Sequence, residues 1–135
     1  PMGQMMRETF NRYGVTWIEA IDFPGAEQMG IMRRFFEDHQ WWGLEPISAA
    51  GSAVLGRKRP LAAASKDGTC IVAYYSAQAR KPLELEGRAG IWQASWFDPR
   101  TGAMHDAGTI EAEGTLTLLR RPALDDWLFV LEKRL

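Results

Sequence analysis

The side chains in this chain that could do chemistry are its carboxylates, two histidines and one cysteine. Two pairs of carboxylates lie close together in the sequence, Glu19 with Asp22 and Asp125 with Asp126. Cleavage of a glycosidic bond needs two carboxyl groups on either side of that bond, about 5–10 Å apart. The sequence places neither pair across a cleft, and Asp125 and Asp126 are typical of a solvated turn before an apolar segment. We therefore expect no catalytic carboxylate.

The histidines, the cysteine and the glycines form no recognised reaction motif. His39 and His105 lie in different regions, and no H-x-x-x-H or C-x-x-C spacing is present, so we expect no metal site and no cofactor. Cys70 lies within a run of β-branched and aromatic residues, which indicates a structural thiol. The glycines of residues 87–90 do not open a helix, so they do not predict a phosphate-binding loop.

The chain holds six tryptophans, a large share of 135 residues. Trp92 and Trp96 are four positions apart, so on a strand they would share one face. Exposed there, they would form a stacking platform for a sugar; turned inward, they would belong to the core, which is the interpretation we favour. Trp41 and Trp42 are interpreted as a hydrophobic clasp between a helix and the strands that follow it.

Charge and length limit the classes of partner and fold. The formal net charge is −1, from 16 basic and 17 acidic residues. Nucleic acids and anionic membranes attract proteins with a basic excess, so we expect neither as a partner. No apolar run approaches the roughly 18 residues that cross a bilayer. The single cysteine excludes an intrachain disulfide, and the length suits one domain, or one domain with a short appendage.

Residues 1–45 are predicted to form a helical segment. Good helix formers at residues 4–13 precede Gly14, which predicts a first helix that ends there. A second helix begins at Pro24, which fits a first-turn position, and should stop between His39 and Trp42. Apolar side chains recur along this second helix: Met29, Met32, Phe35 and Phe36. Without a covering partner they would leave an apolar patch that invites self-association.

The rest of the chain, residues 46–135, is predicted to be a β-domain. Residues 43–60 read as a connector with a basic triplet at residues 57–59, which we interpret as a solvated loop. From Leu61 onward polar and apolar residues alternate, and turn signals recur. Short strands are predicted at residues 61–65, 69–76, 83–86, 91–97, 104–110, 115–119 and 127–131. The pattern favours a mainly β fold, an antiparallel β-sandwich of about seven strands.

The turn after the strand at residues 91–97 is marked clearly. Asp98 can accept bonds from backbone N–H groups, and Pro99 fixes φ at the second position. Gly102 tolerates the positive φ that the chain needs as it turns back. Asp98, Pro99 and Gly102 are therefore predicted to be structural residues of a turn.

Three stretches of the chain resemble a known family. Residues 17–29, continuing to Trp41, resemble the end of the barrel domain in apiosidase-like glycoside hydrolases. Residues 96–102 (WFDPRTG) resemble a signature of the small domain that follows that barrel, and residues 126–132 (DWLFVLE) resemble its ending. That small domain is labelled as collagen-binding. The catalytic residues of such proteins lie in the (β/α)8 barrel, most of which this chain lacks.

The resemblance implies a non-catalytic accessory domain of a bacterial glycoside hydrolase, with the last barrel helix attached. Its role would be to stabilise the barrel of the parent enzyme, which would be its main partner. Exposed tryptophans would instead make it a carbohydrate- or collagen-binding module, and a self-contained glycoside hydrolase is a third alternative. The chain opens with Pro1, so we expect a fragment, exported if its parent carries an upstream signal. We also expect homo-oligomers through the exposed helix face.

Overall fold

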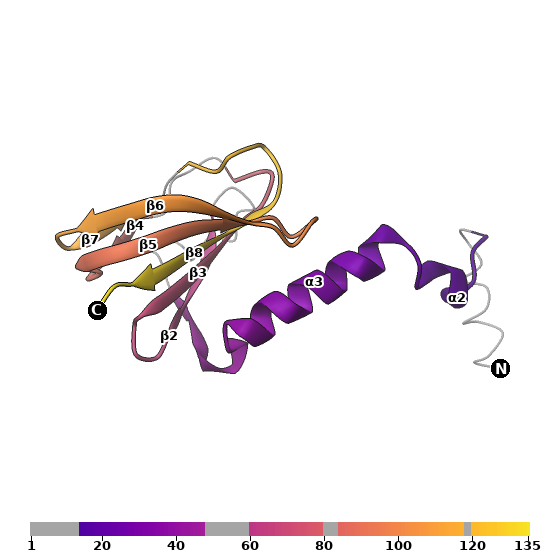
Figure 1. The fold of residues 1–135 in the computed structure, drawn as a ribbon, viewed down its shortest axis with the longest axis horizontal. Helices are drawn as coiled ribbons and strands as arrows, with labels where there is room; N and C mark the ends of the chain where they lie inside the picture. The colour runs from indigo at the N-terminus through magenta and orange to yellow at the C-terminus, as the bar shows by residue number, and fades with distance from the viewer. Residues whose placement is uncertain (1–13, 48–59, 80–83, 118–119) are drawn as a thin grey trace.

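The computed structural model describes residues 14–47, 60–79, 84–117 and 120–135 and is mainly β, as predicted. The eight strands of this part form two antiparallel sheets (Figure 1). One has six strands in the order β1-β2-β3-β8-β5-β6, and the other pairs β4 with β7. The strands are β1 Leu44–Ile47, β2 Leu61–Ser65, β3 Cys70–Tyr75, β4 Glu84–Glu86, β5 Gly90–Phe97, β6 Met104–Ala112, β7 Thr115–Thr117 and β8 Trp127–Lys133.

The helical part precedes the strands. It consists of a short helix α2, Trp17–Ala20, a longer helix α3, Pro24–Asp38, and a 3₁₀ turn η2, Trp41–Gly43. The prediction of a helix from Pro24 is confirmed, because Pro24 is its first residue. The helix ends before Gln40, whose φ of 50° is left-handed. The first helix predicted at residues 4–13 lies outside the described residues.

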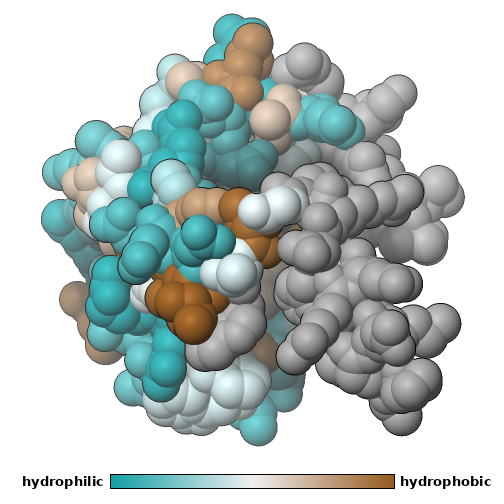
Figure 2. Space-filling model, turned by 90° about the vertical axis from the view of Figure 1, so that its right-hand side faces the viewer, coloured by the Kyte–Doolittle hydropathy of each residue, from teal (hydrophilic) through white to brown (hydrophobic). Residues whose placement is uncertain are grey.

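The α2 end of the helical part projects away from the sheets (Figure 1). Several large apolar side chains are exposed in α2, in the link to α3 and in the first half of α3: Ile18, Ile21, Phe23 and Met29. Met29 is 71% exposed and Ile18 is 61% exposed, although both are residue types that proteins usually bury. Figure 2 looks at the molecule from this end and shows hydrophobic side chains gathered among hydrophilic ones. We call these four residues the helix-end patch.

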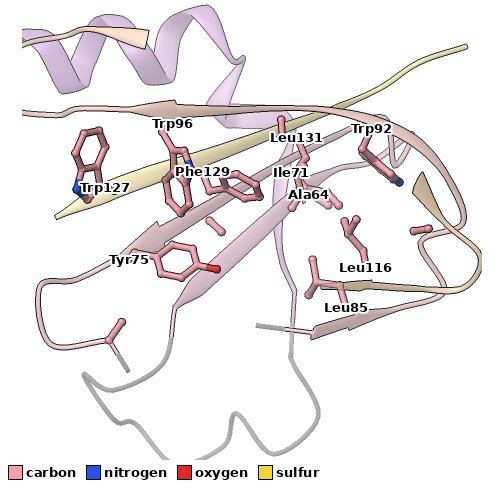
Figure 3. Close-up of a cluster of buried hydrophobic side chains, with 14 residues drawn as sticks. Ala64, Ile71, Tyr75, Leu85, Trp92, Trp96, Leu116, Trp127, Phe129 and Leu131 are labelled. Atoms are coloured by element: carbon pink, nitrogen blue, oxygen red, sulfur yellow. The ribbon is translucent and has the colours of Figure 1, made fainter. Parts of the chain in front are cut away.

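The six-stranded sheet is covered on both faces. On one face β4 and β7 enclose the larger core with Leu85 and Leu116, and Trp92, Phe129 and Leu131 are at most 1% exposed there (Figure 3). On the other face α3 places Ile31 and Phe35 against four sheet residues: Val72, Phe97, Leu128 and Val130. Strand β8 is therefore apolar at every position from 127 to 131, because alternate side chains enter different cores.

Two predictions about the junction between helix and strands are wrong. Residues 44–47, assigned to a connector, form the edge strand β1 paired with β2. Pro46 is tolerated because an edge strand needs only one ladder of hydrogen bonds. Trp41 and Trp42 do not clasp the helix to the sheet, since they are 58% and 64% exposed.

The apolar face predicted for α3 is only partly open. Phe35 is 3% exposed, and Met32 and Phe36 are partly buried against the smaller core, so the chain's own sheet covers these three side chains. Met29 alone of the four predicted residues stays largely open. The basic triplet at residues 57–59 lies outside the described residues.

Candidate functional site

The turn 98–103, which joins β5 to β6, is the most distinctive local structure in the part of the chain that is described. The backbone N–H of Asp98 donates to the carbonyl of Ala103 at 2.9 Å, and the carbonyl of Asp98 accepts from the N–H of Gly102 at 2.8 Å. Gly102 has a φ of +79°, a conformation that glycine adopts without strain. Thr101 closes the turn, because its hydroxyl accepts from the N–H of Ala103 at 3.2 Å.

Arg100 is the centre of a charged network on this turn. Its Nε and Nη2 donate to the two carboxylate oxygens of Asp98 at 2.9 and 3.0 Å, and its Nη1 lies 2.7 Å from Oδ2 of Asp125. The guanidinium also lies over the ring of Trp127, 5.5 Å from its centroid. The hydrogen bonds from Arg100 lower the pKa of Asp98. Asp98 is thus a paired carboxylate and has no character of a general base.

The segment 120–126, just before β8, is held from two sides. Asp125 binds Arg100 of the turn, and Oδ1 of Asp126 accepts from the N–H of Ala77 at 2.6 Å. Arg121 donates to the carbonyls of Ser76 and Ala77 beyond the end of β3. The carboxylate pair considered for catalysis therefore consists of two hydrogen-bonded anchors that face different partners.

Trp92 and Trp96 both lie in the larger core, with 1% and 5% of their surface exposed. The indole N–H of Trp92 donates to the carbonyl of Arg88 at 3.1 Å. The ring of Trp96 packs against Phe129 and Tyr75, with centroids 4.4 and 5.3 Å apart. Their burial favours the core alternative, because a sugar stacks on a ring face that is open to solvent.

The remaining candidate reactive side chains are buried or interact with neighbouring groups. Burial raises the pKa of the Cys70 thiol to about 11, so it is not an activated nucleophile. Nδ1 of His39 lies 2.7 Å from the carbonyl of Phe35. Glu19 accepts from the N–H and hydroxyl of Thr16, which lowers the pKa of its carboxyl group and caps α2. Within the described ranges no cluster of three metal-binding side chains occurs, and no helix is long and apolar enough to span a membrane.

A surface groove that the sequence did not suggest lies between α3 and the β1 edge of the sheet. It has a volume of about 590 Å³ and is lined by the apolar residues Phe36, Leu44 and Ala63. The exposed indole of Trp41 also lines it. Arg33 and Glu37, joined by an ion pair of 2.8 Å, contribute charge to the same groove. The sequence signal at this groove is Trp41, although the Trp41-Trp42 pair predicts a buried clasp there.

Comparison with known proteins assigns the strands to a family. Residues 49–132 match a protein-family model described as "Putative collagen-binding domain of a collagenase". The chain belongs to this family. The match begins after α3 and β1 and includes the turn 98–103, so the domain that defines the family is built from the strands. No curated protein matches the sequence.

Solved structures extend the likeness to the helical part. A structure titled "Glycoside hydrolase" matches 90% of this chain at a TM-score of 0.69 and 17% identity. A glycoside hydrolase family 5 protein from Bacteroides vulgatus ATCC 8482 matches 87% of this chain at 0.67 and 16% identity. The chain spans only 28% and 26% of these two proteins. Residues 49–135 make up less than two thirds of the chain, whereas the two matches cover 90% and 87% of it. Both matches therefore include part of the helical segment.

Proposed function

We propose that this chain is a non-catalytic accessory domain of a glycoside hydrolase-like protein and that its helix-end patch docks on the catalytic barrel. The exposure of that patch carries the proposal. Ile18, Ile21, Phe23 and Met29 are exposed in the segment from α2 to the first half of α3, and α2 projects from the sheets (Figure 1). The two glycoside hydrolases that the chain resembles are more than three times its length, which leaves room in such proteins for a separate catalytic domain.

In this proposal the apolar side chains of the patch are removed from water when they contact the surface of the barrel. Burying one large aliphatic or aromatic side chain contributes roughly 1.5–3 kcal/mol. Four such side chains on one helical end would hold two domains together without any ion pair. The arrangement of the acidic residues supports a role without catalysis, because Asp98, Asp125 and Asp126 are each held in hydrogen bonds or ion pairs.

The proposal is tested on the parent protein. We expect the reading frame upstream of Pro1 to encode a barrel of about 250 residues. In that protein, Met29→Glu should lower the melting temperature by a few degrees, because it places a charge in the interface. Leu124→Glu is the matched control, since Leu124 is 70% exposed and lies in the segment 120–126.

Two results would contradict the accessory role. One is a parent without a barrel, or one in which both variants change the melting temperature equally. The other is turnover of aryl glycosides by the purified chain, for which we expect none.

The groove at Trp41 favours a second candidate function, the binding of an extended ligand. An exposed indole beside apolar and charged side chains can stack on a sugar or on a proline-rich strand. The volume of about 590 Å³ is within the range of ligand sites. We propose this groove as the place where a carbohydrate or collagen would bind. Trp92 and Trp96 would be the alternative location only if their buried rings became exposed.

Fluorescence titration separates the two locations. We expect a plant-polysaccharide oligomer or a collagen-like peptide to quench tryptophan emission, and Trp41→Ala to weaken binding by about tenfold, or 1.4 kcal/mol. Trp92→Phe is the control, since it preserves an aromatic ring in the core. Loss of binding in Trp92→Phe but not in Trp41→Ala would place the site at Trp92 and Trp96. No quenching by either probe would remove the binding function.

A further inference from the structure

The turn 98–103 contacts helix α3 as well as its own strands. Gly102 lies against Ile31 so closely that an added Cβ would be 3.3 Å from Cγ2 of Ile31. Next to it, the rings of Phe97 and Phe35 pack with centroids 4.4 Å apart. Ile31 and Phe35 are the two buried residues of α3. The turn thus reaches the same part of the helix that packs on the sheet.

The other side of the turn is held by charge. Arg100 joins Asp98 within the turn to Asp125 in the segment 120–126, and its guanidinium covers Trp127 at the start of β8. The turn is therefore fixed to the sandwich by Arg100, while Gly102 meets the helix. A tight turn with no Cβ at the contact allows the helix to approach the backbone.

We propose that the turn 98–103 is a joint that fixes α3 relative to the sandwich, with Gly102 as the contact and Arg100 as the positioning residue. The face of the turn at Gly102 contacts the side of α3 that carries Ile31, in the same chain. The consequence of the joint rests on the proposed function. Because α3 leads to the helix-end patch, the joint would set the angle between this domain and the catalytic barrel.

Hydrogen exchange of the full chain, measured by mass spectrometry, tests the joint. Gly102→Ala adds a methyl group 3.3 Å from Ile31 and strains a φ of +79°. Gly108→Ala is the matched control, because Gly108 has a φ of +83° with nothing within 4 Å of an added Cβ. We expect exchange in α3 to accelerate about tenfold in Gly102→Ala, with β3 and β8 unchanged. Gly108→Ala should leave the ratio of α3 to β8 protection as in the wild type.

A second pair of variants covers the case in which Gly102→Ala does not fold. Arg100→Ala removes the positioning residue and should also accelerate exchange in α3. Arg120→Ala changes an exposed arginine in the segment 120–126 and should not. The joint is refuted if α3 protection is equal in Gly102→Ala and Gly108→Ala. If Gly102→Ala is not obtained folded, equal protection in Arg100→Ala and Arg120→Ala refutes it. These measurements involve no barrel, so their failure would not affect the proposed accessory role.

Discussion

The charged residues that the sequence offered for catalysis are held by near neighbours. Asp98 is enclosed by Arg100, Asp125 shares the same guanidinium, and Asp126 accepts from the backbone of Ala77. The hydrogen bonds from Arg100 stabilise the Asp98 anion and lower the pKa of this carboxyl group. The sequence could identify these residue types but not their partners, because Asp126 and Ala77 meet only after β3 and β8 pair.

The pairing of Asp98 predicts a pH dependence of stability. Its pKa is lowered below the ordinary value of 3.8, so its contribution is present above that value and is lost as pH falls through the folded pKa. We expect Asp98→Asn to cost about 1.5 kcal/mol at neutral pH, at the lower end for a bond to a charged group because Arg100 is 41% exposed. Urea unfolding at a series of pH values measures this difference.

The difference between wild type and Asp98→Asn should shrink in acid. Asp67 needs a separate control, because its hydrogen bonds to Ser65 and Thr69 lower its pKa to about 2. Asp67→Asn should leave the acid-dependent difference due to Asp98 in place. A gap between wild type and Asp98→Asn that stays constant down to about pH 2 would show that Arg100 does not stabilise the anion.

At the scale of elements, segments with clear boundary signals were predictable and unmarked short ones were not. Helix α3 followed from Pro24 and the apolar spacing, and β2 from the Asp-Gly turn after it. The three-residue strands β4 and β7 followed from the polar and apolar alternation and the turn signals that end them. Strand β1 has four residues, one of them Pro46, and its hydrogen bonds to β2 have no local signal. Helix α2 is equally short and was not predicted.

The alternation of residues along a strand also could not show whether the aromatic side chains face the core or the solvent. Alternation placed Trp92 and Trp96 on the same face of a strand, and the structure has them so. Which face is covered depends on β4 and β7, which lie over that side of the sheet (Figure 3). The opposite error concerns Trp41 and Trp42, because their position at a helix end predicts burial whereas both rings are exposed.

At the scale of the whole molecule, the helix-end patch is an apolar surface that the described part of the chain leaves exposed. Exposed apolar groups favour self-association. We expect the isolated chain to form dimers and Met29→Glu to shift it to monomers, as measured by light scattering. Leu124→Glu, at an equally exposed position in the segment 120–126, should not. A wild-type chain that is monomeric at all concentrations would contradict this expectation.

The short path from α3 to β1 has a mechanical consequence. Only residues 39–43 separate the helix from β1. Among the described strands β1 pairs only with β2, and it contains a proline that donates no hydrogen bond. Tension applied to the helix would therefore reach the sheet at its outermost ladder. That ladder would open before the pairing of β3 with β8, so the sheet would lose β1 under load while β3 and β8 stay paired.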